Sequence, residues 1–448
     1  MKKIIPTLIL ALLLCSCSVA ASPETTRSQT GPSETASSAS SAATAPTETS
    51  APAGTSVPAG TSVPAGTSTP AESTIPTAAP SPAETTEPAE SSAPPETQKP
   101  TESTASSTES PSQEADIVES ILSKMTVEEK VGQIFLAFCP GKGAAADAAA
   151  YHLGGYILFA SDFTGETPTS FREKVESYQS AVSIPLLIAV DEEGGTVTRV
   201  SRFTAFRDSR FPSPRSLYAE GGLEAVLTVE AEKSSLLRSL GIQVNMAPVC
   251  DITMDPEAFM YDRSLGLEPE ETGQVIAAMV QTMAEYSVGS VLKHFPGYGN
   301  NTDTHTAMAI DSRTLEELES WDLVPFAAGI AAGCDAILVS HVIVEALDDT
   351  YPATLSPEVH RYLRENMGFE GVIVTDDLAM QAISDSYGAG EAAVLAVLAG
   401  NDLLCCQEYR VQYAAVLEAV EDGRISTEIL DSAVTRVLRW KQTLGLIE

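Results

Sequence analysis

Strand-like apolar runs alternate with helix-like stretches through most of this chain, and this alternation restricts its fold more than any other feature. The runs lie at residues 131–138, 155–159, 186–190, 243–249, 288–292, 336–339, 372–374 and 403–405. Because helix-like stretches separate them, the strands they predict are joined by crossover helices and run parallel. Eight such runs favour closure into a barrel over an open doubly wound sheet. We therefore predict an α/β fold, a (β/α)8 barrel of the TIM type.

Nucleotide-binding motifs are missing from the places where such a fold would carry them. No Gly-x-Gly-x-x-Gly follows the first run, and no glycine-rich loop ends in Gly-Lys-Ser or Gly-Lys-Thr. Nucleotide chemistry is therefore not expected.

The N-terminal segment has the form of an export signal. Two lysines precede an apolar run that is too short to span a bilayer, and the run ends in Leu14-Cys15-Ser16-Cys17. This ending resembles the bacterial lipobox, which implies that residues 1–17 are a lipoprotein-type signal peptide and that Cys17 is acylated. The chain would then be exported and held by lipid on the outer face of the cell membrane. The alternative is an ordinary secretory signal and a secreted chain.

Residues 18–113 are almost wholly Ser, Thr, Pro, Ala, Gly and Glu, with a repeated Pro-Ala-Gly-Thr-Ser-Val hexapeptide. So little apolar surface cannot offset the entropy lost on ordering, so we predict a disordered linker. Residues 114–448 remain for one barrel domain.

Charge and cysteine content narrow the partners and the chemistry. The formal net charge of −35 disfavours nucleic acid and anionic membrane surfaces, since both bind basic patches. Beyond the signal region the cysteines match no metal-binding spacing, and a barrel of this length does not depend on disulfides. We predict that Cys139, Cys250, Cys334, Cys405 and Cys406 are small buried apolar residues.

Ionisable residues follow the apolar runs, at the carboxyl end of one predicted strand after another. They are Asp191, Asp251, Lys293 with His294, His341, and Asp376 with Asp377. In a parallel barrel all these ends open on one face, so the side chains converge there. The loop 293–305 adds Asp303 and His305. The sequence therefore predicts a polar cleft at the carboxyl ends of the strands.

Three kinds of hydrolase suit such a cleft. A metal hydrolase is disfavoured because no His-x-His pair follows the first run, and a serine hydrolase because no Gly-x-Ser-x-Gly elbow is present. Glycoside hydrolysis fits better, since it needs an ionised carboxylate near the anomeric carbon and a proton donor for the leaving oxygen.

Six motifs occur in order, at residues 188–195, 245–252, 262–264, 293–297, 303–305 and 374–380. Together they resemble glycoside hydrolase family 3, in particular its single-domain β-N-acetylhexosaminidase branch. Two positions depart from the branch pattern: Tyr298 replaces a frequent His, and Thr196 a frequent Arg. These changes affect the rim of the cleft and leave the preference for the leaving group open.

The resemblance implies a retaining mechanism with Asp376 as nucleophile and His305, held by Asp303, as general acid and base. Asp377 would point away from the cleft, and His341 would pack or hydrogen-bond behind it. The resemblance also implies that the hydroxyls of the sugar are bound by Asp191, Arg199, Arg263, Lys293 and His294. It implies no metal and no cofactor.

The expected activity is exo-β-N-acetylglucosaminidase, acting on terminal β-linked GlcNAc of cell-wall or chitin-like oligosaccharides, and we expect the chain to act as a monomer. The alternatives are a β-glucosidase or xylosidase of the same family, and a non-catalytic carbohydrate-binding surface protein.

Overall fold

The computed structural model of the chain describes residues 111–299 and 308–448. These residues belong to one compact unit. The predicted signal peptide and nearly all of the predicted linker lie outside the described residues, as do Asp303 and His305.

Eight parallel strands form the centre of this unit, in the order β10-β1-β2-β3-β4-β5-β7-β9. The ring closes where Val374 of β9 bridges Leu403, next to β10. The strands are β1 (Phe135–Phe138), β2 (Gly155–Leu158), β3 (Leu187–Val190), β4 (Val244–Asn245), β5 (Gly289–Phe295), β7 (Ala336–Val339), β9 (Val372–Thr375) and β10 (Leu404–Cys406). The predicted α/β barrel is therefore confirmed.

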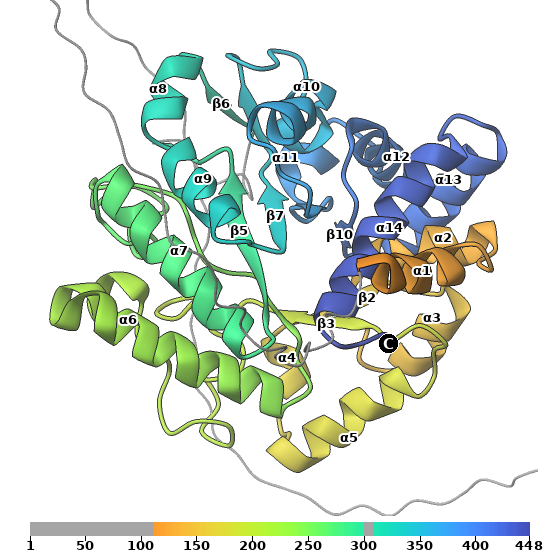
Figure 1. Ribbon diagram of the computed structural model, residues 1–448, viewed down its shortest axis with the longest axis horizontal. Coiled ribbons are helices and arrows are strands. Elements are labelled where there is room, and N and C mark those ends of the chain that lie inside the picture. Colours follow the sequence, from red (N-terminus) through yellow and green to blue (C-terminus); the bar gives the residue numbers. More distant parts are fainter. Residues whose placement is uncertain (1–110, 300–307) are drawn as a thin grey trace, which may run out of the picture. The chain divides into compact units, whose positions relative to one another are not determined.

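Helices surround the strands and connect each one to the next (Figure 1). They are α1 (Pro111–Leu122), α2 (Val127–Gln133), α3 (Ala144–Ala150), α4 (Ala160–Phe163), α5 (Pro168–Gln179), α6 (Pro214–Ser239), α7 (Pro269–Glu285), α8 (Leu315–Ser320), α9 (Leu323–Ala331), α10 (Pro357–Arg361), α11 (Gln381–Ser384), α12 (Ala389–Ala399), α13 (Tyr409–Glu421) and α14 (Thr427–Thr443). Short helical turns cover Ala353–Leu355 and Tyr362–Asn366.

Alternate strand residues fill the inside of the barrel. In β3, Leu187 and Ala189 belong to the interior cluster, whereas Ile188 and Val190 pack outward against the helices. This follows from the two-residue period of a strand. Trp440 of α14 closes the amino-terminal end, where its ring packs against Gly289 at the start of β5. The opposite end, at the carboxyl ends of the strands, remains available for a binding site.

The first predicted strand is wrong at its start. The sequence predicts an extended run over 131–138, but Val131–Gln133 ends helix α2 and the strand begins only at Phe135. The cause is local, because Thr126 and Glu129 form a capping box that starts a helix at Val127. An apolar run alone does not distinguish a buried helix end from a buried strand.

Four of the five cysteines predicted to be buried are so, and Cys139 is half-buried. Within residues 111–299 and 308–448, no helix combines the length and the apolar character that a bilayer crossing needs.

Candidate active site

A cavity of about 610 Å³ opens at the carboxyl ends of the strands. Its walls come from the ends of most strands and from the loops that follow them. The polar lining residues are Asp191, Glu193, Thr196, Arg199, Asp262, Arg263, Lys293, His294, Tyr298, Asp376 and Asp377. Apolar side chains such as Phe138, Phe159 and Met380 complete the wall. A concavity that combines apolar wall residues with convergent polar groups is typical of a small-molecule site.

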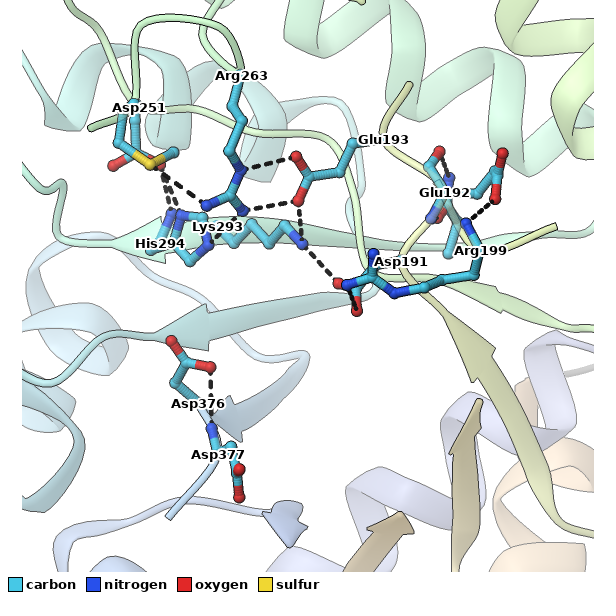
Figure 2. A network of polar contacts seen from close by, with 12 residues as sticks. Asp191, Glu192, Glu193, Arg199, Asp251, Arg263, Lys293, His294, Asp376 and Asp377 are labelled. Carbon is cyan, nitrogen blue, oxygen red and sulfur yellow. Dashed lines mark hydrogen bonds and ion pairs between the residues drawn. The ribbon is translucent and has the colours of Figure 1, made fainter. Parts of the chain in front are cut away.

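Four charged side chains form a connected network on one wall of the cavity (Figure 2). The Lys293 ammonium lies 2.8 Å from Asp191 Oδ1 and 2.6 Å from Glu193 Oε1. Arg263 holds Glu193 from the other side, with Nη2 2.7 Å from Oε1 and Nε 2.9 Å from Oε2. Bidentate guanidinium–carboxylate pairing fixes both partners in one geometry.

Mutual stabilisation favours the charged forms of Glu193, Lys293 and Arg263 although burial opposes them. Burial alone would raise the pKa of Glu193, but the charges of Arg263 and Lys293 outweigh it and hold that pKa well below its usual range. Burial also opposes the charge of Lys293, yet Asp191 and Glu193 raise its pKa. The pKa of Arg263 is raised chiefly by Glu193, again against the effect of burial.

His294 is fixed on both sides of its ring. Its Nδ1 lies 2.8 Å from Asp251 Oδ2, and its Nε2 lies 3.1 Å from Arg263 Nη2. A guanidinium only donates, so Nε2 accepts and the proton sits on Nδ1, facing Asp251. Asp251 also accepts the backbone N–H of Tyr298, which ties the loop after β5 to the loop after β4. Asp251 therefore orients His294 from behind the cavity wall.

Both Lys293 and His294 line the cavity although they are consecutive in strand β5. In a regular strand they would face opposite sides. The pairing of β5 with β7 shifts register between Leu292 and Phe295, and this irregularity includes both residues. Such shifts redirect side chains next to active sites.

The loop after β3 is held by Glu192, whose side chain points away from the cavity network. Its carboxylate accepts the backbone N–H groups of Arg199, Val200 and Ser201. This places the Arg199 side chain beside Asp191, with Nη2 3.5 Å from Oδ2, and over the ring of Phe159. The Nε of Arg199 is buried without a protein partner among the described residues.

Asp376 follows β9 directly and lines the cavity. Its Oδ1 accepts the backbone N–H of Asp377 at 2.9 Å. Figure 2 shows the two carboxylates pointing to opposite sides of the strand end, as the alternation predicts, although Asp377 also borders the cavity. The Asp377 carboxylate accepts the N–H of Ala379, so it serves the turn that follows.

His341 lies behind this strand end rather than in the cavity. It is fully buried, and its ring nitrogens lie 2.7 Å from Thr354 Oγ1 and 2.9 Å from the Asp377 carbonyl oxygen. Since that carbonyl only accepts, Nε2 donates to it. The expectation that His341 hydrogen-bonds behind the cleft is confirmed.

Comparisons with known proteins assign the chain to a family. The family described as glycosyl hydrolase family 3 N terminal domain matches residues 126–440. The chain belongs to glycosyl hydrolase family 3.

Several proteins named beta-hexosaminidase are similar to this family 3 chain. One from Tolumonas auensis is 34% identical over 311 residues, which cover 66% of this chain and 90% of that protein. Beta-hexosaminidase LpqI of Mycobacterium tuberculosis is 32% identical, over 71% of this chain and 83% of LpqI.

A solved family 3 β-N-acetylglucosaminidase from Paenibacillus sp. has a similar fold. It superposes with a TM-score of 0.67 at 35% identity, over 72% of this chain and 63% of that structure. The present chain thus spans under two thirds of that larger molecule, whereas it spans most of the curated relatives.

The structure brings together six of the eight predicted site residues of this family 3 chain. Asp191, Arg199, Arg263, Lys293, His294 and Asp376 all line the one cavity. The other two, Asp303 and His305, lie outside the described residues. Sequence reasoning did not assign roles to Glu193, which joins Lys293 to Arg263, or to Asp251, which orients His294.

Proposed function

We propose that this chain is a retaining exo-β-N-acetylglucosaminidase that removes terminal β-linked GlcNAc from cell-wall or chitin-like oligosaccharides. The chain is a glycoside hydrolase of the β-N-acetylhexosaminidase type, because it belongs to family 3 and its curated relatives carry the name beta-hexosaminidase. One observation carries the mechanism: Asp376 lines the same cavity as the ionised network of Asp191, Glu193, Arg263 and Lys293.

The network supplies groups suited to the hydroxyls of a pyranose. Asp191 accepts hydrogen bonds, and Lys293, Arg263 and Arg199 donate them. Of the three N–H groups of the Lys293 ammonium, two face carboxylates in the described part of the chain. His294 supports this arrangement between Asp251 and Arg263 and also lines the cavity.

The proposed reaction has two steps. In the first, a carboxylate oxygen of Asp376 bonds to the anomeric carbon, the glycosidic C–O bond breaks, and His305 gives its proton to the leaving oxygen. In the second, His305 takes a proton from water, the water oxygen bonds to the anomeric carbon, and Asp376 is released. Asp303, two residues before His305 in the sequence, would favour the protonated imidazole before the first step if the two side chains meet.

Replacing the nucleophile tests this assignment. Asp376→Asn should lower turnover of 4-nitrophenyl β-GlcNAc by roughly three orders of magnitude or more. In Asp376→Gly, azide should restore release of 4-nitrophenol and yield a glycosyl azide, since the small anion fits the space that the carboxylate leaves. In the matched variant Asp377→Gly, azide should form no such product. Undiminished turnover in Asp376→Asn would contradict the assignment of Asp376 as the nucleophile.

The choice of sugar is tested by comparing the β-GlcNAc substrate with the corresponding glucoside and xyloside. We expect a kcat/KM preference for the N-acetylated sugar. A preference for glucoside would favour the β-glucosidase alternative, and no turnover of any of the three would favour a carbohydrate-binding role.

The proposed steps use only carboxylate and imidazole groups, so EDTA should leave the rate of hydrolysis unchanged.

The N-terminal sequence supports a proposal for location. Residues 1–17 fit an export signal, and acylation of Cys17 would hold the enzyme on the outer face of the membrane through the linker 18–113. A Cys17→Ala variant should move from the membrane fraction to the soluble fraction.

We further propose that the chain is a monomer. The test is the mass in solution of the chain without its signal peptide.

A further inference from the structure

A second hollow, of about 750 Å³, lies beside the catalytic cavity on the same end of the barrel. Its walls come from the loop after β4, from Gly299 in the loop after β5, from β6 (Ala309–Asp311) and from helix α8. The proposed reaction makes no use of these residues.

Exposed apolar side chains gather in this hollow. Met254, Ile310 and Trp321 are 45%, 53% and 37% exposed, and all three line it. They come from three separate segments, so their convergence is a property of the fold. Apolar side chains that collect in a concavity with polar residues around them mark a binding site more often than a chance exposure.

The polar residues of the hollow determine what kind of ligand fits. Exposed carboxylates of Asp255 and Glu317 lie among the lining residues, together with the hydroxyl of Ser320. The charge of Arg313 is already paired with Asp311, at 2.6 Å, and with Asp322. The hollow is therefore net negative, which disfavours anionic ligands.

A flat aromatic ring beside several hydrogen-bond acceptors suits a neutral ligand rich in hydroxyls. An exposed indole such as that of Trp321 can stack on the C–H side of a pyranose ring, while carboxylates can accept from the hydroxyls at the ring edge.

The same two loops line the hollow and the catalytic cavity, although no residue lines both. The loop after β4 gives Met254 and Asp255 to the hollow and Phe259 and Arg263 to the cavity, while the loop after β5 gives Gly299 to one and Tyr298 to the other. Phe259, itself exposed, packs on Tyr298 with ring centroids 5.7 Å apart. The same two loops would thus contact both ends of an extended ligand.

We infer that the hollow around Trp321 is a second carbohydrate-binding site, which holds sugar units of an oligosaccharide beyond the terminal unit that is cleaved. This inference rests on the proposed function and adds a specificity for longer substrates to it.

Intrinsic fluorescence offers a direct test, because the chain has two tryptophans. Trp440 is 5% exposed at the far end of the barrel, so Trp321 is the indole that a ligand reaches. Titration with a thio-linked GlcNAc tetramer, which is not hydrolysed, should give a saturable change in wild type and in Trp440→Phe. The change should vanish in Trp321→Phe. A response that survives in Trp321→Phe, or no response in wild type, would overturn the inference.

Kinetics offer the second test. Trp321→Ala should lower kcat/KM for a GlcNAc tetramer about tenfold and leave kcat/KM for 4-nitrophenyl β-GlcNAc within about twofold. The matched control Val411→Ala removes an exposed apolar side chain of α13 and should change neither value. Equal losses on both substrates, or none on either, would contradict a second site.

The two proposals fail differently. If wild type cleaves the glucoside but not β-GlcNAc, the proposed function is wrong, and the same fluorescence titration with a thio-linked glucose tetramer decides the second site. If wild type cleaves β-GlcNAc but Trp321 has no effect in either test, only the second site is wrong. Saturable binding of a basic peptide with no response to either tetramer would also exclude the carbohydrate assignment.

Discussion

Glu193 is the residue on which the polar wall of the cavity depends most, because it pairs with both Lys293 and Arg263. Glu193→Gln removes the negative charge and leaves the buried Lys293 and the partly buried Arg263 with fewer partners. We expect a loss of stability on the order of 3 kcal/mol at pH 7 and a loss of activity at least tenfold. Urea unfolding and steady-state kinetics measure the two effects.

The stability difference should depend on pH in a definite direction. The pKa of Glu193 is depressed in the folded chain from its ordinary value of 4.5, so its contribution is present above that value. As pH falls below 4.5, the unfolded chain takes up a proton that the folded chain does not, and the gap between wild type and Glu193→Gln should narrow. Glu358→Gln, which breaks an exposed pair with Arg361, is the control and should cost under about 1 kcal/mol. A gap that widens in acid would contradict the proposed pairing.

For single residues, the sequence predicts which side chains line the cavity better than it predicts which of them pair with one another. Residues 191 and 193 share a face of an extended chain, and residue 192 faces the other way. This alternation is a signal that could have assigned Glu193 to the cavity and Glu192 to the loop behind it. That both Lys293 and His294 line the cavity could not be predicted in this way, because it accompanies a register shift between β5 and β7, strands far apart in the sequence.

Among the elements, the start of β5 and helix α14 are packed closely against each other. A Cβ added to Gly289 would lie 2.9 Å from ring atoms of Trp440, and a buried indole has little room to move. Gly289→Ala should therefore destabilise the fold by about 1–3 kcal/mol and lower the thermal midpoint by several degrees. Because this contact lies at the amino-terminal end of the barrel, kcat of the folded enzyme should stay unchanged.

Gly388→Ala is the matched control for that variant. Its added Cβ meets nothing within 4 Å, and its φ of −68° suits alanine. The thermal midpoint should shift little, by the equivalent of about 0.5 kcal/mol or less. Equal thermal midpoints for the two variants would refute the packing argument for the barrel bottom.

Each predicted apolar run corresponds to one barrel strand, and the run 336–339 has the bounds of β7. The run 243–249 is regular only at Val244–Asn245, and Pro248, which has no N–H to donate, lies beyond it. The small sheet of β6 and β8 (Val342–Val344) was not predicted. Its strands have three residues each, and a pattern of that length carries no period that sequence reasoning can detect.

For the whole molecule, we expect the barrel to fold and to act without the first 110 residues. The family match begins at residue 126, and every described residue that lines the cavity lies between Phe138 and Cys405. A chain that starts at Pro111 should keep kcat/KM for 4-nitrophenyl β-GlcNAc within about twofold and should keep its thermal midpoint. A large loss of either would mean that the N-terminal residues contribute to the folded domain.

The pairing of Lys293 and Arg263 with Asp191 and Glu193 has one further consequence. Before any sugar arrives, these positive and negative groups already balance one another, and a neutral hexose brings no charge of its own. At this wall of the cavity, dissolved ions therefore have little net charge to screen. The Michaelis constant for an uncharged glycoside should hence be nearly indifferent to ionic strength, so the enzyme would work alike in dilute and in briny surroundings.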